Sequence, residues 1–446
     1  MEPQVLKGFR DYLPEEMLPR QRMIANIERV FQRFGFAPLQ TPALEYAELL
    51  LGKYGDEGDK LLFRFLDNGQ RDVAMRYDLT VPLARLLGTH RDTIMPFKRY
   101  QIGPVWRAEK PARGRFREFV QCDIDTVGVK ELTADGEIVS AGIAALREVL
   151  AVHDTPEARA KRGGSPAITL RLSNRKLLTG LCVWLGVAEG APAITLFRTL
   201  DKLDKQGEGP VREALMRDCG LDAAQVERVF QYLKCPATVS DFAPLHALFG
   251  ANPVAELGIQ ELTQVIQSVR EHGYGEYLAL DLSIARGLDY YTSTIYETTL
   301  NGLDGFGSIM SGGRYDELLA MFTGKAMPAV GISVGLDRLL AGLLELGLAE
   351  SRPTPAVILV TVFSPEQRAH ATTLAQTLRA AGHSAELNLT DDKLGKQFRA
   401  ADRKKIPYVL ICGPDEQAQG VLKIKHLASG EEKTLPQDAL SQWSPA

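Results

Sequence analysis

Two short stretches alternate polar and apolar residues, which predicts strands with one chemically active face. In residues 119–127, FVQCDIDTV, the polar side chains that point to one side of a strand are Gln121, Asp123 and Asp125. In residues 75–81, MRYDLTV, the corresponding side chains are Arg76, Asp78 and Thr80. Carboxylates, an amide and a hydroxyl that meet in one space suit an ammonium group and a polar heterocycle. For either stretch alone, the alternative is the solvated outer face of an antiparallel sheet.

Arginines near these stretches could supply an anion site. Arg107 and Glu109 follow the predicted strand 97–106, and Arg286 lies at another predicted strand end. Arg338 lies in the first turn of a predicted helix, where the helix dipole favours an anion. The loop KPARGRFR is also basic, with Lys110, Arg113, Arg115 and Arg117. Because guanidinium groups donate paired hydrogen bonds to phosphate oxygens, three separated arginines could converge on one nucleotide. A solvated hairpin tip is the alternative for the loop.

Several common nucleotide and metal sites are excluded. No Gly-x-x-x-x-Gly-Lys-[Ser/Thr] loop occurs, and Gly305 and Gly307 are followed by Met310 where a dinucleotide fingerprint needs a third glycine. The seven histidines form no ligand cluster, and the five cysteines include no Cys-x-x-Cys pair. A transition-metal site and a disulfide framework are therefore not expected.

The elements that must position these residues follow from periodicity. Residues 17–34 repeat apolar residues at three- and four-residue steps, which predicts an amphipathic helix. Period-two runs predict strands at 75–81, 97–106 and 117–127. Antiparallel pairing is favoured because the gaps between these runs mostly lack room for crossover helices. Residues 174–272 are helix-rich and alternation returns at 277–297, so we expect a helical insertion within one sheet.

The last part of the chain has a pattern of its own. A polar linker at 351–355 precedes alternating strand and helix patterns, which predict a small α/β domain. One predicted helix and its end carry an excess of basic residues, namely Lys393, Lys396, Arg399, Arg403, Lys404 and Lys405. This excess is a candidate RNA-phosphate surface, and a solvated helix face is the alternative.

Composition limits the class of protein. The 446 residues, 45% hydrophobic and 24% charged, suit two to four globular domains at about 150 residues each. The formal net charge is -4, so an anionic partner must meet a local basic surface. No apolar secretion segment occurs, and no run approaches the ~18 apolar residues of a membrane span. We therefore expect a cytoplasmic protein with no membrane partner.

Several of these stretches resemble the motifs of histidyl-tRNA synthetases, which are class II aminoacyl-tRNA synthetases. ARGLDYYTSTIYE at 285–297 and SGGRYDELL at 311–319 are similar to the two signatures peculiar to that family. The three class II motifs have counterparts in FGFAPLQTPALE at 34–45, VWRAEKPARGRFREFVQCDIDTVG at 105–128 and VGISVGLDRLL at 330–340. The resemblance runs from KGFRDYLP near the N-terminus to the end of the chain, with the motifs in the right order.

The resemblance implies an α+β fold with an antiparallel six-stranded catalytic sheet flanked by helices. It also implies a helical insertion and a C-terminal α/β anticodon-binding domain. In this sequence the catalytic domain would comprise residues 1–173 and 273–350, the insertion 174–272, and the anticodon-binding domain 351–446. A homodimer formed through the first class II motif is implied as well.

The resemblance further implies a histidine-tRNA ligase. Such an enzyme joins L-histidine and ATP into histidyl-adenylate and pyrophosphate, with Mg²⁺ bridging phosphates, and then transfers the histidyl group to the 3′ end of tRNA(His). Residues that match histidine-binding positions are Asp78, Leu79, Thr80, Arg107, Gln121, Asp125, Arg286, Tyr290 and Tyr291. Residues that match ATP-binding positions are Arg107, Glu109, Arg115 and Arg338. Arg107 and Arg286 would be catalytic because they match arginines at the α-phosphate; the Mg²⁺ ligands are not identified.

The alternative from another class is a non-catalytic, synthetase-like regulatory subunit of ATP phosphoribosyltransferase in histidine biosynthesis. Such relatives typically lose the signature arginine and the C-terminal domain. Here Arg286, Arg338 and the whole tail are present, which favours the ligase.

Overall fold

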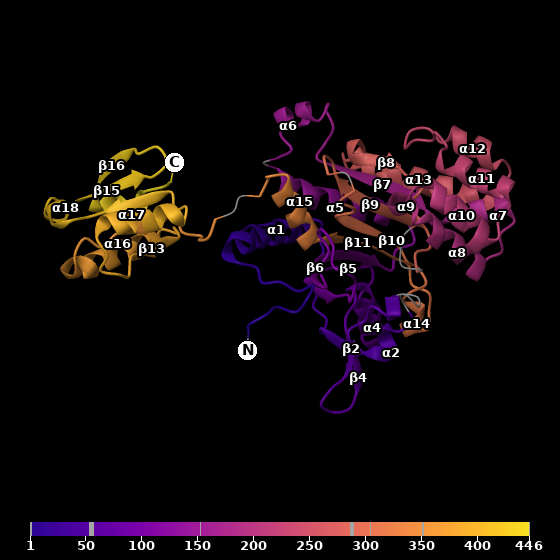
Figure 1. Cartoon of the computed structure of the whole chain (residues 1–446), viewed down its shortest axis with the longest axis horizontal. Coiled ribbons are helices and arrows are strands. Elements are labelled where there is room, and N and C mark those ends of the chain that lie inside the picture. Colours follow the sequence, from indigo (N-terminus) through magenta and orange to yellow (C-terminus); the bar gives the residue numbers. More distant parts are fainter. Residues whose placement is uncertain are drawn as a thin grey trace. The chain divides into compact units, whose positions relative to one another are not determined.

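The computed structural model describes residues 2–52, 58–151, 153–285, 290–303, 305–349 and 352–445. The chain forms two compact units, one of residues 1–10 with 22–349 and the other of residues 11–21 with 350–446. Figure 1 shows the elements of both units, coloured along the sequence.

The first unit is built around an eight-stranded sheet in the order β1-β5-β6-β11-β10-β9-β7-β8 (Figure 1). Its strands are β1 (Ala37–Pro38), β5 (Phe97–Trp106), β6 (Glu118–Val127), β7 (Ile168–Asn174), β8 (Leu278–Leu280), β9 (Thr294–Leu300), β10 (Met310–Arg314) and β11 (Ala329–Gly335). The six strands from β5 to β7 in this spatial order pair antiparallel. The edge strands β1 and β8 pair parallel with β5 and β7.

The prediction of a purely antiparallel, six-stranded sheet is therefore correct for the centre and wrong at both edges. The parallel pairing at the edge follows from how the strands are connected along the chain. Strand β8 follows the helices after β7, and this long connection lets the chain return in the same direction, which a hairpin cannot do.

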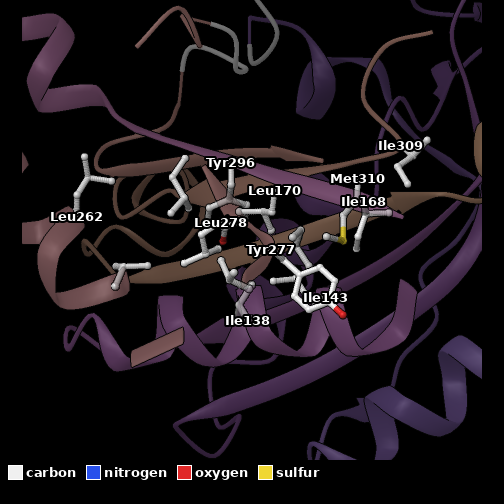
Figure 2. Packing of buried hydrophobic residues seen from close by; sticks show 14 of the residues in the cluster. Ile138, Ile143, Ile168, Leu170, Leu262, Tyr277, Leu278, Tyr296, Ile309 and Met310 are labelled. Carbon is white, nitrogen blue, oxygen red and sulfur yellow. The ribbon is translucent and has the colours of Figure 1, made fainter. Parts of the chain in front are cut away.

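One face of this sheet is covered by helices, and the contact forms the main hydrophobic core. Ile27 of α1 (Pro14–Arg33) and Ile138 and Ile143 of α5 (Thr133–Leu150) are fully buried in it. Figure 2 shows side chains of α5 lying against strands β7, β9 and β10 of the sheet. Cys122 and Ile124 of β6 enter the same core, as the alternation predicts. The polar residues of β6 consequently face the opposite side.

A smaller three-stranded sheet has the order β2-β4-β3. Its strands are β2 (Leu44–Tyr46), β3 (Arg64–Leu66) and β4 (Asp72–Met75), and the helices near it are α2 (Ala47–Leu50), α4 (Thr80–Thr89) and α14 (Ala320–Thr323). The predicted strand at 75–81 is wrong, since β4 ends at Met75 and α4 begins at Thr80. The carboxylate of Asp78 accepts hydrogen bonds from the backbone N–H groups of Thr80 (3.1 Å) and Val81 (3.0 Å), which favours the start of a helix.

Between β7 and β8 the described chain is helical, as predicted for 174–272. The helices are α7 (Arg175–Leu185), α8 (Ala191–Leu200), α9 (Leu203–Gln206), α10 (Glu208–Cys219), α11 (Ala223–Leu233), α12 (Ala243–Phe249) and α13 (Pro253–Glu271), followed by the 3-10 turn η1 (Gly275–Tyr277). Local signals fix their starts: Asp222 and Gln225 form a capping box on α11, and Asn252 caps α13 ahead of Pro253. Two further helices of the first unit are α6 (Pro156–Lys161) and α15 (Leu336–Glu345).

The second unit contains a five-stranded sheet in the order β13-β12-β14-β15-β16. The strands are β12 (Ile358–Val360), β13 (Ala385–Leu387), β14 (Tyr408–Ile411), β15 (Val421–His426) and β16 (Glu432–Pro436), and the helices are α16 (Arg368–Ala380), α17 (Leu394–Arg403) and α18 (Pro414–Ala418), with 3-10 turns η2 (Pro365–Gln367) and η3 (Gln437–Gln442). This is the α/β pattern that the tail predicts. In either unit, no helix within the described ranges has the length and apolar character needed to cross a membrane.

Candidate active site

A cavity of about 200 Å³ lies on the polar side of the eight-stranded sheet. Its walls come from the loop between β5 and β6, from β6, β10, β11 and the residues just before β10, and from the start of α15. Five of the predicted site residues line it: Arg107, Glu109, Arg115, Gln121 and Arg338. Two of the three arginines predicted to converge therefore do so, whereas Arg286 lies outside the described residues.

Arg107 is held between two aromatic rings. Its guanidinium group lies 4.3 Å from the ring centre of Tyr77 and 5.2 Å from that of Phe119, and its Nε donates to the carbonyl of Tyr77 at 3.0 Å. Cation–π contacts of this kind orient a guanidinium group without neutralising its charge. Arg107 therefore brings a positive charge to the cavity wall.

The basic loop places only some of its residues in the cavity. Arg115 reaches Glu109 through an Nη1–Oε2 contact of 3.5 Å, and both line the cavity. Arg117 instead supports the loop, since its Nε donates to the carbonyl of Glu109 at 3.0 Å. Arg113 forms an ion pair with Glu345 of α15. Of the four basic residues of this loop, Arg115 is therefore the one that lines the cavity.

Arg338 ties together two segments of the cavity wall. Its Nη1 donates to the carbonyl of Ser308 at 2.8 Å, and its Nε donates to that of Gly114 at 3.3 Å. The preceding residue, Asp337, accepts a hydrogen bond from the backbone N–H of Val120 at 2.6 Å. These contacts fix the start of α15 against β6, and the helix start favours an anion in the cavity.

Beyond Gln121, the polar face of β6 continues into a pocket of buried acids. Gln121 donates from Nε2 to the hydroxyl of Ser333 at 2.6 Å, and Ser333 lies opposite Asp123 in the pairing of β6 with β11. Asp123 and Asp125 are 3% and 2% exposed. A solvated outer face, the alternative considered for this stretch, is thereby excluded.

The carboxylate of Asp125 is held at both oxygens. Nη2 of Arg99, from β5, lies 2.6 Å from Oδ2, and the hydroxyl of Tyr315 donates to Oδ1. A Cβ atom at Gly331 would come within 2.0 Å of Oδ1, so glycine is required opposite Asp125 for close approach of the strand. We refer to Asp78, Asp123, Asp125, Arg99 and Tyr315 as the acid pocket.

Burial and mutual repulsion shift the pKa values in the acid pocket. Burial raises the pKa of Asp123 to about 7; the charges of Asp125 and Asp78 add to the rise, and Arg99 opposes it. Burial also raises the pKa of Asp125 against the opposing effects of Arg99 and Tyr315. The three carboxylates therefore lie close enough to interact, with a guanidinium group among them.

The segment before α4 supplies the other side of the pocket. Asp78 and Leu79 are buried, and the carbonyl of Leu79 accepts a hydrogen bond from Nη2 of Arg99 at 3.1 Å. Arg76 does not join them, because its guanidinium group donates to the carbonyls of Thr41 (2.7 Å) and Pro104 (2.9 Å). Its predicted place beside Asp78 and Thr80 followed from the wrong strand assignment.

Tyr290 and Tyr291 stack edge to face, with ring centres 5.0 Å apart, and Tyr290 lies 5.8 Å from Tyr315. Burial and the charges of Asp125, Asp78 and Asp123 raise the pKa of Tyr291, which places its hydroxyl near the acid pocket. A Cβ atom at Gly313 would approach the Tyr291 ring to 2.8 Å. Gly313 of SGGRYDELL thus makes room for this tyrosine.

Sequence reasoning missed Arg99, Ser333 and Tyr315. Two of them had a signal: Arg99 alternates with Gln101 in the predicted strand 97–106, and Tyr315 follows Arg314 in the second signature. The pairing of Arg99 with Asp125 required the register of β5 with β6, which no local pattern supplies.

The site thus has two adjoining parts along β6. The cavity presents guanidinium groups, which suit phosphate oxygens. The acid pocket presents hydrogen-bond acceptors in a buried setting, which suit an ammonium group or a ring N–H. The described residues include no group of three or more histidine, cysteine, aspartate or glutamate side chains that could hold a metal ion.

The chain matches known families and proteins over nearly its whole length. A model of the family described as "Histidyl-tRNA synthetase" matches residues 8–339, and one described as "Anticodon binding domain" matches residues 356–444. Proteins named histidine-tRNA ligase are similar over nearly the whole chain. One from Rhodopirellula baltica is 42% identical, with 100% of this chain and 97% of its own covered, and one from Wolinella succinogenes is 40% identical, with 97% and 95% covered.

Solved structures give the same result. The histidyl-tRNA synthetase of a Nostoc species superposes with a TM-score of 0.85 at 34% identity and covers 99% of both chains. A structure from Bacillus halodurans, described as an ATP phosphoribosyltransferase regulatory subunit/histidyl-tRNA synthetase, has a TM-score of 0.72 at 24% identity over 90% of this chain and 97% of its own, a likeness of fold alone. The family match over residues 8–339 and the full-length relatives lead to one conclusion: the chain belongs to the histidyl-tRNA synthetase family.

Proposed function

We propose that this chain attaches L-histidine to tRNA(His) in two steps at the site described above. Histidine and ATP first form histidyl-adenylate and pyrophosphate, and the histidyl group then passes to the 3′ end of the tRNA. The observation that carries the proposal is the adjoining arrangement of a guanidinium-lined cavity and an acid pocket along β6. The cavity suits a nucleotide, and the acid pocket suits an amino acid with a polar ring.

The cavity would bind ATP. Arg107, together with Arg286 by family resemblance, would contact the α-phosphate, while Glu109, Arg115 and Arg338 would contact the rest of the nucleotide. Arg107 is suited to this role because its aromatic neighbours orient its guanidinium group and the residue lines the cavity. The contacts of Arg338 with Ser308 and Gly114 keep that side chain beside the cavity as well.

The acid pocket would bind histidine. Asp78, Leu79, Thr80 and Gln121 would surround the ammonium group, and Asp125 and Tyr291, with Tyr290 beside them, would contact the imidazole. Because the carboxylate of Asp125 is buried and accepts hydrogen bonds, an amino acid lacking a ring N–H would leave it incompletely paired. Unpaired buried polar groups can make such discrimination ~10⁴-fold or more.

The chemistry of the first step needs no general base, because the attacking carboxylate of histidine is already ionised. A carboxylate oxygen bonds to the α-phosphorus, and the bond from that phosphorus to the oxygen bridging the β-phosphate breaks, which releases pyrophosphate. Since two anions must meet, catalysis depends on positioning and on neutralising charge. Arg107 would supply that charge directly.

In the second step a ribose hydroxyl of the tRNA attacks the carbonyl carbon of the histidyl-adenylate, and AMP leaves.

We further propose that Mg²⁺ enters with the nucleotide, where it would supply neutralisation of the phosphate charge. Glu109 is the carboxylate of the cavity lining, and its contact with Arg115 is long at 3.5 Å, so it fits the role of a ligand to such an ion. Measuring exchange activity in Glu109→Gln across Mg²⁺ concentrations tests this assignment.

The proposal extends to the rest of the chain. We infer an insertion domain at 174–272 between catalytic parts at 1–173 and 273–350, and an anticodon-binding domain at 351–446 that contacts tRNA(His). In that domain Lys396 is paired with Asp392 (2.9 Å) and Lys404 with Glu386, so the remaining charge of α17 and its end, on Lys393, Arg399 and Arg403, would face RNA phosphates. Charging assays on tRNA variants altered at the anticodon test this role.

A cytoplasmic homodimer is also proposed. Four large apolar side chains of the three-stranded sheet are exposed, namely Leu44, Tyr46, Phe65 and Leu66 at 44%, 51%, 45% and 60%. The sheet begins in the stretch that resembles the first class II motif, and an apolar patch of this kind suits a second copy of the chain. Light scattering at micromolar concentration would give the mass of a monomer if this inference were wrong.

The deciding experiment for the function is exchange of labelled pyrophosphate into ATP by the purified full chain. We expect exchange with L-histidine and none without it or with glutamine or phenylalanine. A regulatory subunit would bind histidine and show no exchange. Transfer of labelled histidine to tRNA(His) then tests the second step.

A further inference from the structure

We propose that Arg99 is a positioning residue for histidine, and that it acts by joining Asp125 to the backbone of Leu79 across the pocket. This inference rests on the proposed function and adds to it a residue that holds the binding groups without contacting the reacting atoms. Arg99 is fully buried in β5 and does not line the cavity.

The geometry of Arg99 connects the two sides of the acid pocket. Its Nη2 lies 2.6 Å from Oδ2 of Asp125 and donates to the carbonyl of Leu79 at 3.1 Å. The first contact follows from the sheet register, in which Arg99 pairs directly with Asp125. The second crosses to the segment before α4. One guanidinium group thereby sets the distance between the residue proposed for the imidazole and the segment proposed for the ammonium group.

Arg99 also leaves Asp125 able to accept hydrogen bonds from a ligand. A carboxylate has about four lone-pair positions. Arg99 occupies one oxygen and Tyr315 donates to the other, so the orientation of the group is fixed while acceptor positions remain. A protonated Asp125 would keep one carbonyl acceptor and turn its other oxygen into a donor, which a ring N–H cannot use.

The charges around Asp125 explain why a cation is needed there. Asp78 and Asp123 are the other carboxylates of the pocket, and Tyr291, Tyr296 and Tyr315 are the phenols near it. Arg76 is a second cation whose charge interacts with that of Asp123. Among the described residues, Arg99 is the cation that acts on Asp123, Asp125 and Tyr315 together. Without it, burial and repulsion would drive a proton onto Asp125.

The matched control is provided by the neighbouring residue. Lys98 also makes one ion pair, to Glu137 at 2.8 Å, and one contact with a backbone carbonyl, that of Phe34 at 2.7 Å. Its side chain points to the opposite face of β5. Replacing Lys98 therefore removes the same kinds of contact from the same strand without touching the acid pocket.

The experiment compares Arg99→Met with Lys98→Met by histidine-dependent pyrophosphate exchange. For Arg99→Met we expect KM for histidine to rise by about 10-fold or more while KM for ATP stays within about twofold. For Lys98→Met we expect neither constant to change by more than about twofold. Arg99→Lys should restore part of the affinity. Equal changes in both KM values, or an unchanged KM for histidine, would overturn the role of Arg99.

The pH profile separates positioning from a merely structural effect. Losing Arg99 leaves the pKa of Asp125 higher, so in Arg99→Met the KM for histidine should fall as pH rises from 6 to 8.5, relative to the wild-type profile over the same range. If Arg99→Met does not fold, the double variant Arg99→Met, Asp123→Asn replaces it in the experiment, because it also removes one buried carboxylate. Wild-type affinity for histidine in that double variant would refute the inference. Absence of exchange in the wild type would refute the function itself.

Discussion

The two parts of the site are held in different ways. In the cavity, Arg107 and Arg338 are fixed by aromatic faces and loop carbonyls, and their charges face accessible space. In the acid pocket, Asp123 and Asp125 are almost fully buried on a central strand and are ordered by register. The cavity therefore depends on oriented cations that water can reach. The acid pocket depends on a rigid sheet and on a balance of buried charges.

If the cavity and the acid pocket are separable, Arg107→Ala should impair the cavity much more than the acid pocket. We expect histidine-dependent pyrophosphate exchange to fall by about 10²–10³-fold, because a charge placed at the reacting phosphate is lost. The midpoint of thermal unfolding should change little, since Arg107 is only partly buried. Binding of histidine alone, measured by calorimetry, should weaken far less than exchange does, although Arg107 also matches a histidine-binding position. Exchange within twofold of the wild type would contradict the role of Arg107.

The reverse experiment is Gly331→Ala, which adds one carbon where a Cβ would lie within 2.0 Å of Oδ1 of Asp125. The carboxylate must then move away from the bonds that hold it, so KM for histidine should rise by roughly 10-fold while KM for ATP is less affected. Gly335→Ala, where a Cβ would meet the carbonyl oxygen of Ile309 at 3.6 Å, is a control on the cavity side. A larger effect of Gly331→Ala on ATP than on histidine would show that the parts are not separable.

A smaller effect concerns stability and pH. Asp123 has a pKa raised to about 7, above the value of about 3.9 expected in the unfolded chain. The folded state therefore binds more protons between these values, and the free energy of unfolding should fall as pH rises from about 4 to 7. Asp123→Asn removes this dependence. The free energy of unfolding of the variant minus that of the wild type should be higher at pH 8 than at pH 5 by about 1 kcal/mol or more, as measured by urea unfolding.

No such gain would arise if Asp123 were ionised throughout this range. The control is Asp72→Asn, whose carboxylate is exposed and paired with Arg64, so its effect should be nearly the same at both pH values. A parallel pH dependence in the two variants would remove the distinction between a buried acid and a solvated one.

Much of this could be predicted from the sequence because it depends on local pattern. The alternation in β6 predicted which side of the strand would carry Gln121, Asp123 and Asp125, and burial of Cys122 and Ile124 in the core confirmed it. The motif order also identified the family. Alternation failed at residues 75–81, where Asp78 starts a helix; a short polar residue before an apolar run can indicate a cap as well as a strand.

What the sequence could not supply was pairing between distant residues. The contact of Arg99 with Asp125 depends on the register of β5 with β6, and that of Tyr315 with Asp125 spans 190 positions. The parallel pairing of the edge strands β1 and β8 was not predicted for a similar reason, since strands of two and three residues carry too little pattern to show which neighbour they pair with.

The strict alternation along Glu118–Val127 has a consequence for how this pocket can change over evolutionary time or by design. Adding or deleting a single residue within the strand would exchange its two faces, which would put aspartates into the apolar interior and Cys122 and Ile124 among the ligand groups. New amino-acid preferences can therefore arise here by replacing side chains at alternate positions, whereas an insertion or deletion of one residue would disturb the core and the ligand groups together.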